Sequence, residues 1–234
     1  MVSISLTIDF FTQLNEREDI IMDILEIMKE RHSVRQYKNQ AIEPFKREEI
    51  NAWISAVNAE SKLSIQAFYE EPKCFNSFMA HYGKFKNVKN YIAIVGSKND
   101  QEKAGYYGEK IVLKCQEFGL NTCWVAMTHG KSKAQIKRGQ KLLIIISLGY
   151  GETQGVPHKS KSIEELGKAD RSTEWFERGM EAVSLAPTAV NQQKFLFELK
   201  NGNVTAKNLG GFYSKIDLGI VKYHFEAVTG HEVK

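Results

Sequence analysis

The chain has 234 residues, a formal net charge of +4, 42% hydrophobic residues and a mean hydropathy of −0.37. This composition is typical of a soluble globular protein, and the absence of any run of about 18 apolar residues argues against a membrane-spanning helix. The N-terminal residues lack the pattern of a signal peptide, and three scattered cysteines indicate neither a disulfide framework nor a metal site. We therefore expect a cytoplasmic protein.

Lysine clusters at residues 84–89, 131–141 and 159–168 account for the basic charge. A nucleic-acid-binding protein would use such clusters as its footprint. Here acidic residues interrupt them and no recognised nucleic-acid motif accompanies them. We expect a solvated surface, with a phosphate-bearing ligand as the next alternative and no nucleic-acid partner.

The hydrophobic pattern predicts helices and strands in alternation after a poorly patterned extension at residues 1–18. The first helix starts at residue 19, with Asp19 as its cap, and delivers the chain to Arg31. Further helices are expected at residues 46–58, 101–118, 172–185 and 213–228, and strands at 65–69, 91–96, 142–150 and 195–199. The segment at 120–128 follows the long central helix, which ends at Gly119. The strand at 142–150 is apolar enough to be buried on both faces.

The segment from Glu30 to Tyr37, ERHSVRQY, is the first candidate binding element. If it is extended, alternation places four side chains on one side over about 13 Å: Arg31, Ser33, Arg35 and Tyr37. Two neighbouring guanidinium groups favour an anion between or beside them, and arginine is suited to forked contact with phosphate. The alternative is a surface basic segment paired with Glu30 and Glu43.

The stretch from residue 182 to 199, AVSLAPTAVNQQKFLFEL, is the second candidate. Pro187 stops an apolar helix, because proline cannot continue the hydrogen-bond ladder and disfavours the helical region for the residue before it. The loop that follows is rich in amide and hydroxyl groups and lies between two buried elements. Such a loop can bind the edge of a flat heterocycle; the alternative is an ordinary solvated turn.

Together these two stretches resemble the signatures of the flavin-dependent nitroreductase family. The family pattern Arg-Arg-Ser-x-Arg-x-aromatic is similar to residues 31–37, with His32 in place of an arginine. The pattern Ala-Pro-Ser-x-x-Asn-x-Gln-Pro-Trp is similar to residues 186–195, with Lys194 and Phe195 in place of Pro-Trp. The resemblance implies an α+β fold with a mixed β-sheet flanked by helices.

The resemblance also implies a site for flavin mononucleotide (FMN). Arg31 would hold the phosphate, with His32 as a further donor and Ser33 on the phosphate or ribityl chain, while Arg35 would lie near the pyrimidine edge of the ring. The remaining residues would come from the segment at 122–126, which offers backbone N–H groups, from a basic segment and from the proline loop: Trp124, Val125, Lys159, Lys161, Pro187, Thr188 and Asn191. In this segment Cys123 is expected to be a small buried hydrophobe rather than a redox thiol.

Three weak internal echoes follow one another in the same order along the chain. Residues 161–166 echo 41–45, residues 182–195 echo 56–68, and residues 217–221 echo 108–112. The first half keeps the arginine segment and lacks the proline loop, whereas the second half keeps only the loop. Because the resemblance implies a homodimer with flavins at its interface, we infer a fused pseudo-dimer of half-units 19–155 and 156–234, monomeric and with one flavin site.

On this basis we expect an oxidoreductase that passes hydride from NADH or NADPH through the flavin to a small electron acceptor, such as a nitroaromatic compound or a quinone. No side chain is assigned to catalysis, since the flavin carries the chemistry, and no Gly-x-Gly-x-x-Gly turn is present to grip a nicotinamide. A flavin-binding protein without turnover is the alternative, because the family's Gly-Gly is Ala126-Met127 here. A basic nucleic-acid module is the third hypothesis.

Overall fold

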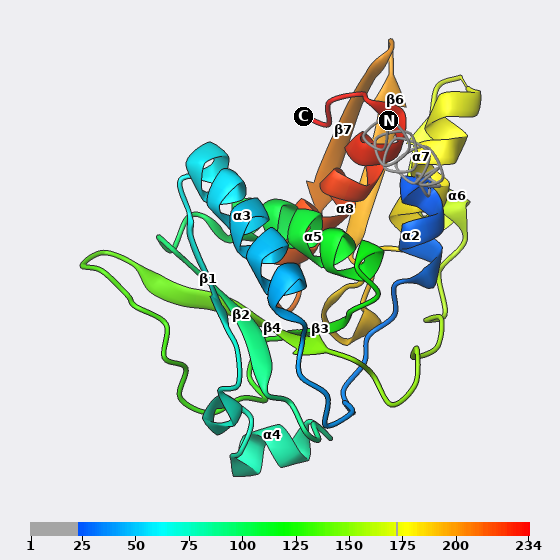
Figure 1. Cartoon of the computed structure of the whole chain (residues 1–234). Helices are drawn as coiled ribbons and strands as arrows, with labels where there is room; N and C mark the ends of the chain where they lie inside the picture. The colour runs from blue at the N-terminus through cyan, green and yellow to red at the C-terminus, as the bar shows by residue number, and fades with distance from the viewer. Residues whose placement is uncertain (1–22, 172) are drawn as a thin grey trace, which may run out of the picture.

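A computed structural model of the chain describes residues 23–171 and 173–234 (Figure 1). The extension predicted at residues 1–18 and the cap predicted at Asp19 lie outside the described residues. The first described helix, α2 (Ile24–Glu30), is capped by Asp23, whose carboxylate accepts a hydrogen bond from the Leu25 amide at 3.2 Å. It delivers the chain to Arg31, as the sequence predicts.

Four antiparallel strands form the larger sheet, in the order β1 (Ser64–Phe68), β2 (Asn90–Gly96), β4 (Lys141–Gly149) and β3 (Asn121–Val125). Side chains alternate between its faces, so that Ile92 and Ile94 enter one apolar cluster and Tyr91 and Ala93 enter another. Strand β4 is buried on both faces over most of its length, which confirms the expectation from its composition.

Helices α3 (Pro44–Ser61) and α5 (Gln101–Glu117) cover one face of this sheet (Figure 1). The opposite face packs against the arginine segment and against an excursion between β1 and β2 that the sequence pattern did not predict. That excursion contains the short helical turn η1 (Pro72–Cys74) and helix α4 (Phe78–Tyr82). The sheet is therefore enclosed between two layers.

The second part of the chain builds a separate small sheet beside two long helices. Its elements are α6 (Ile163–Leu166), β5 (Gly167–Ala169), α7 (Glu174–Ser184), the turn η2 (Ala189–Asn191), β6 (Phe195–Lys200), β7 (Asn203–Asn208) and α8 (Ser214–Thr229). Strand β5 is parallel to β6, and β6 is antiparallel to β7. The α+β class is as predicted, but mixed pairing occurs in this small sheet, whereas the larger one is antiparallel.

Helices α5 and α8 cross at the centre of the molecule through two glycines (Figure 1). A Cβ on Gly105 would lie 2.0 Å from the Ile216 carbonyl oxygen, and a Cβ on Gly219 would lie 1.8 Å from the Glu102 carbonyl oxygen. The two contacts are reciprocal, because one shift along the chain relates Gly105 to Gly219 and Glu102 to Ile216. This is the pattern of a two-fold contact, and its register differs from the third sequence echo, which pairs Gly108 with Asp217.

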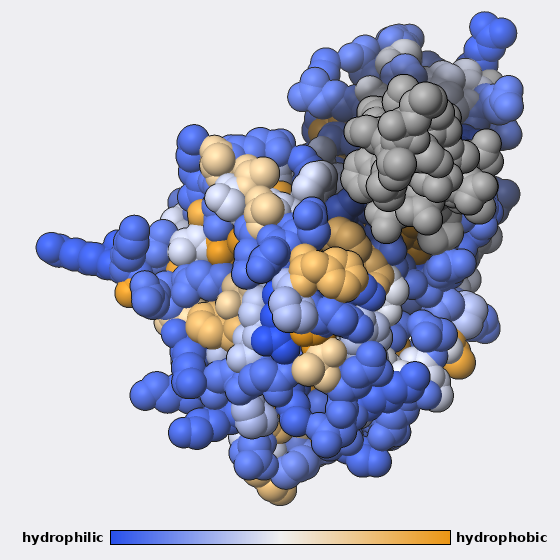
Figure 2. Space-filling view, viewed as in Figure 1, coloured by the Kyte–Doolittle hydropathy of each residue, from blue (hydrophilic) through white to orange (hydrophobic). Residues whose placement is uncertain are grey.

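The same order of elements occurs on both sides of this crossing. Helix α3, strands β1 and β2 and helix α5 are matched by α7, β6, β7 and α8, and each strand pair is antiparallel. The surface is mostly hydrophilic on the face seen in Figure 2, with scattered apolar patches. Within the described ranges, every helix is too short or too polar to cross a bilayer.

Candidate functional site

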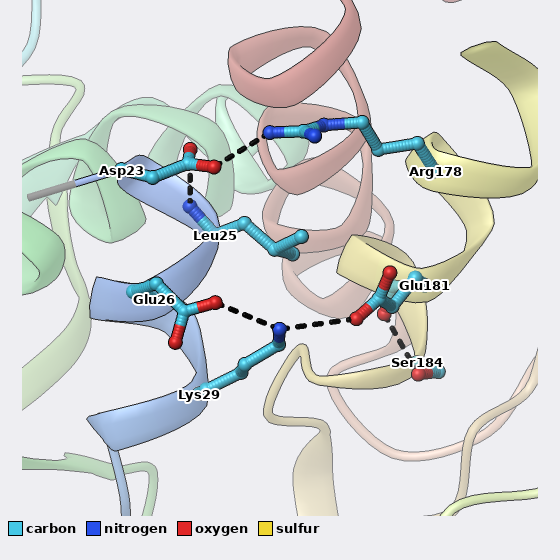
Figure 3. Close-up of polar contacts among 7 residues, drawn as sticks. All are labelled: Asp23, Leu25, Glu26, Lys29, Arg178, Glu181 and Ser184. Carbon is cyan, nitrogen blue, oxygen red and sulfur yellow. Dashed lines mark hydrogen bonds and ion pairs between the residues drawn. The ribbon is translucent and has the colours of Figure 1, made fainter.

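Helices α2 and α7 bring the two predicted binding segments together (Figure 3). Arg178 on α7 contacts the Asp23 carboxylate at 2.6 Å, and Lys29 on α2 contacts Glu181 at 3.3 Å. Exposed ion pairs of this kind contribute little to stability, so the buried contact beneath them, which includes Met28 and Ala182, holds the helices together. Arg31 leaves the end of α2 close to where α7 ends and the proline loop begins.

The arginine segment lies along strand β3. The Val34 amide donates to the Thr122 carbonyl at 2.9 Å, in a parallel bridge next to Ser33. Tyr37 was expected to share the arginine face, but it is 1% exposed, and its hydroxyl donates to the Val34 carbonyl at 2.7 Å and bonds the Ser147 hydroxyl. Val34 and Tyr37 both point into the core, and Ser33 and Arg35 face the other way. Strict alternation therefore fails at Tyr37.

The proline loop is held by hydrogen bonds to both of its neighbours. The Ala189 amide donates to Asp217 Oδ1 at 3.0 Å, and the Gln193 amide donates to the Thr188 hydroxyl at 3.1 Å. The Asn191 amide group donates to the Lys159 carbonyl at 2.9 Å. The loop is thus a built structure, and the alternative of a loosely solvated turn does not describe it.

Two adjoining cavities form one crevice between the arginine segment and the proline loop. Their shared lining residues are Ser33, Arg35, Pro187, Thr188 and Val190. The first cavity, with about 520 Å³ of empty volume, is completed by residues of β3, β4, η2 and α8: Cys123, Trp124, Ala126, Ile144, Ala189, Tyr213, Ile216, Asp217 and Ile220. The second, about 770 Å³, is completed by Arg31, His32, Val156, Pro157, His158 and Asn191. Arg35 and Asn191 therefore share one crevice, as the functional interpretation requires.

A buried charge network stands behind the crevice. Glu109 on α5 is 0% exposed; it accepts hydrogen bonds from His224 at 3.0 Å and from the Trp124 indole at 2.9 Å, and lies 3.7 Å from Arg31 Nε. Burial raises the pKa of Glu109, but His224 above all, with the Arg31 charge and the Trp124 hydrogen bond, holds it below its usual value. The carboxylate therefore stays charged and compensates the buried Arg31.

Arg31 keeps donors that this network does not use. Its side chain is 3% exposed, yet Nε and Nη1 have no hydrogen-bond partner, and the neighbouring His32 Nδ1 is also buried without one. Buried polar atoms are normally satisfied, so these donors fit an anion that enters the cavity they line. The phosphate of FMN matches this donor set. The surface-segment alternative is wrong for Arg31, and Glu43 contacts Tyr150 and Lys46 instead.

Three predicted residues take other positions. Lys159 and Lys161 are exposed and are not among the residues that line the crevice. The Lys159 carbonyl holds Asn191, and the Lys161 ammonium donates to the Gln193 carbonyl at 3.2 Å, so both support the proline loop. The Val125 side chain packs into the core behind β3, and its neighbour Trp124 lines the crevice.

Asp217 is a crevice residue that the sequence pattern did not single out. It is 5% exposed, and besides Ala189 it accepts a hydrogen bond from the Gln192 amide group at 2.7 Å. Burial raises its pKa to about 6. Its only sequence signal is an acid on the apolar face of a helix. Cys123 also lines the crevice, and burial raises the pKa of its thiol, which agrees with the expected small hydrophobe.

A second hollow lies at the other end of the α5–α8 crossing. Its α5 lining includes four residues that the reciprocal glycine contacts relate to the α8 lining of the crevice. Asn99 corresponds to Tyr213, Glu102 to Ile216, Lys103 to Asp217 and Tyr106 to Ile220. Lys222 and Glu226 of α8 complete this hollow.

A family model described as "Putative TM nitroreductase" matches residues 23–229. The chain belongs to this nitroreductase family. The match covers both the arginine segment and the proline loop, which confirms the family that these segments resemble and makes the protein an oxidoreductase. No curated protein matches the chain.

Solved structures share the fold of this nitroreductase-family protein. A "putative nitroreductase" of Thermotoga maritima is 22% identical, with a TM-score of 0.64, 88% of this chain and 83% of that chain being covered. An FMN-dependent nitroreductase of Clostridium difficile gives 21%, 0.44, 60% and 92% for the same quantities. A "putative nitroreductase" of Desulfovibrio desulfuricans in complex with FMN gives 16%, 0.49, 61% and 94%.

Metal chemistry has no candidate ligands in this nitroreductase-family chain. Among the described residues, no group of three or more histidine, cysteine or acidic side chains is placed to hold a metal ion. His158 Nε2 lies 3.0 Å from the Ser184 carbonyl oxygen, and His224 Nδ1 lies 2.8 Å from the Ala182 carbonyl oxygen. Both rings are thus committed to backbone contacts.

Proposed function

We propose that the protein is an FMN-dependent oxidoreductase that passes hydride from NADH or NADPH to a small electron acceptor, such as a nitroaromatic compound or a quinone. The observation that carries this proposal is the pair of unpartnered guanidinium nitrogens of Arg31, which are buried at the wall of the crevice that also contains Pro187 and Asn191. A cytoplasmic monomer with one flavin per chain, built from two fused half-units, completes the proposal.

The residues divide between the two ends of the proposed flavin. Arg31 and His32 would hold the phosphate, and Ser33 the phosphate or ribityl chain. Pro187 and Thr188 would pack against the ring or bond it. Asn191 already donates to the Lys159 carbonyl, so its free capacity toward the ring is the side-chain oxygen, which accepts from Gln193 at 2.9 Å. Lys159 and Lys161 would act through the loop.

When bound, FMN supplies a ring that accepts hydride at N5 and returns the electrons to an acceptor. The chain would contribute binding, orientation and electrostatics. Arg35 faces both cavities, and a cation near the pyrimidine edge stabilises the negative charge that develops on reduction. The buried apolar wall formed by Ile216 and Ile220 would exclude water from the ring.

A flavin-binding protein without efficient turnover is the second candidate. It is favoured by Ala126, which lines the crevice where the family has glycine. The Ala126 carbonyl also lies 3.5 Å from the Tyr213 hydroxyl, and both groups narrow the approach to the ring. Anaerobic addition of NADH and NADPH to the purified yellow protein separates the candidates, because bleaching requires turnover.

The binding test replaces Arg31 by alanine. Loss of a charge-assisted phosphate contact is expected to weaken FMN binding by about 1.5–3 kcal/mol, or about 10- to 100-fold, measured by fluorescence titration. Lys222→Ala, in the second hollow, is the matched control and is expected to leave the affinity unchanged. Urea unfolding of both variants identifies any loss that comes from a damaged fold.

Two outcomes would contradict this proposal. Unchanged FMN affinity in a folded Arg31→Ala variant would reject the phosphate role. Saturation at two flavins per chain would reject the single site and with it the complementary losses of the two half-units. A protein that takes up no flavin at all would reject the oxidoreductase itself.

A further inference from the structure

Val190 has a backbone conformation that is rare for its residue type. Its φ and ψ are 47° and 27°, in the left-handed region. A β-branched side chain in that region is a genuine outlier, and glycine or asparagine would adopt the conformation at lower cost. The side chain is also 89% exposed, so no core contact compensates for the strain.

The surrounding loop imposes this conformation. The Asn191 amide donates to the Thr188 carbonyl and the Gln192 amide to the Ala189 carbonyl, both at 3.0 Å. Asp217 fixes the Ala189 amide from α8. Residues in strained conformations persist where their surroundings over-determine them, and they concentrate at functional sites.

Val190 also occupies a distinctive place in the crevice. It lines both cavities, so it lies where the arginine end meets the end built on α8. Four of the five residues shared by the two cavities are polar, charged or proline, and Val190 is the exposed aliphatic one. Val156, 79% exposed, lines the second cavity only. An exposed apolar group in a polar crevice marks a contact for an apolar ligand surface.

We propose that Val190 is a specificity-determining residue, whose side chain forms the apolar contact for the planar aromatic ring of the electron acceptor. This inference rests on the proposed function and assigns the acceptor class to one residue of the same crevice. A quinone or nitroaromatic ring covers the isopropyl group when it enters, whereas a small inorganic acceptor has no apolar face to place there.

The test uses Val190→Gly, which removes the apolar group and relieves the backbone. Burial of one valine side chain is worth a factor of about ten in affinity, so the KM for menadione is expected to rise about tenfold. The KM for ferricyanide and the Kd for FMN are expected to stay within twofold. Val190→Ile, which keeps the apolar contact, is expected to retain the wild-type KM for menadione.

A second measurement does not depend on turnover. Val190→Gly is expected to raise Tm by a few degrees, and equilibrium binding of p-nitrobenzoate to the oxidised protein is expected to weaken about tenfold. Lys62→Gly is the control, since Lys62 has a φ of 61° at the end of α3, away from the crevice. It is expected to raise Tm without any change in binding.

An unchanged menadione KM and p-nitrobenzoate affinity in Val190→Gly would overturn the inference, as would weaker FMN binding with an unchanged KM, which would make Val190 a cofactor contact. These results differ from failure of the proposed function, in which the wild-type protein itself takes up no flavin or oxidises no nicotinamide.

Discussion

The crevice and the second hollow occupy corresponding positions at the two ends of the α5–α8 crossing, but they treat charge differently. In the crevice, Ile216 and Ile220 form an apolar wall, and Arg31 keeps unpartnered donors. In the second hollow the corresponding positions hold Glu102 and Tyr106.

The charged side chains of the second hollow bind one another. Lys222 contacts Glu102 at 2.8 Å, Lys103 contacts Asp100 at 3.2 Å, and the Tyr106 hydroxyl donates to Glu226 at 2.6 Å. A ligand would have to break these contacts, whereas the crevice offers donors that are free and already desolvated. The difference teaches that the capacity to bind depends on unsatisfied, pre-positioned groups more than on the existence of a hollow.

The largest expected difference between the two regions concerns their acids. Glu109→Ala leaves Arg31 as an uncompensated buried charge and removes the partner of His224 and Trp124. We expect the free energy of unfolding to fall by about 3–5 kcal/mol. Glu226→Ala, in the second hollow, removes a half-exposed acid and is expected to cost about 1 kcal/mol. Urea unfolding compares them, and equal losses would show that the two regions do not differ in this way.

The next prediction concerns the crossing that relates the two regions. Gly105→Ala and Gly219→Ala each place a Cβ against a backbone carbonyl of the facing helix, which forces the helices apart. Each substitution is expected to cost about 3 kcal/mol, and the two losses are expected to be similar, because the contacts are reciprocal. Calorimetric Tm values give the comparison. A large loss from one glycine beside a small loss from the other would break the correspondence.

The smallest expected effect is a pH dependence confined to the crevice. Burial raises the pKa of Asp217 to about 6, against about 3.9 in an unfolded chain. Only the folded state holds this proton between about pH 4 and 6, so its stabilising contribution is complete below pH 4 and is lost as pH rises through 6. The expected loss is about 2 kcal/mol.

Asp217→Asn removes this titration. The stability of the wild type relative to the variant is therefore expected to fall between pH 4 and 6 and to be constant above about pH 7, measured by urea unfolding at each pH. The corresponding residue of the second hollow, Lys103, provides the control. Its partner Asp100 has a lowered pKa, to which the Ser97 hydrogen bonds contribute more than the Lys103 charge, so Lys103→Ala is expected to give a flat difference over this range.

The sequence predicted the main elements because their apolar residues recur at a helical or strand period, as in β4 and α5. Strand β7 was missed because its sequence, NVTAKN, is polar and half-exposed, and α4 was missed because it is a five-residue helix with exposed Phe78 and Tyr82. The division into two sheets depends on contacts between distant segments, which periodicity does not report.

The candidate site was predicted in part. Arg31, Ser33, Arg35, Pro187 and Asn191 share one crevice, as expected. The contributions of Glu109 and Asp217 could have been suspected, since each is an acid within the apolar stripe of a helix, but their partners come from other elements. The strain at Val190 left no trace in the sequence, because valine is not a residue from which a left-handed turn is predicted.

The two walls of the crevice come from opposite ends of the chain, with Arg31 directly after the first described helix and α8 directly before the C-terminus. During synthesis on a ribosome, the arginine segment emerges long before the helix that completes its wall. The cofactor pocket therefore closes only after translation ends, and a truncated chain that lacks α8 would retain the phosphate-binding cation but have no enclosed place for a ring.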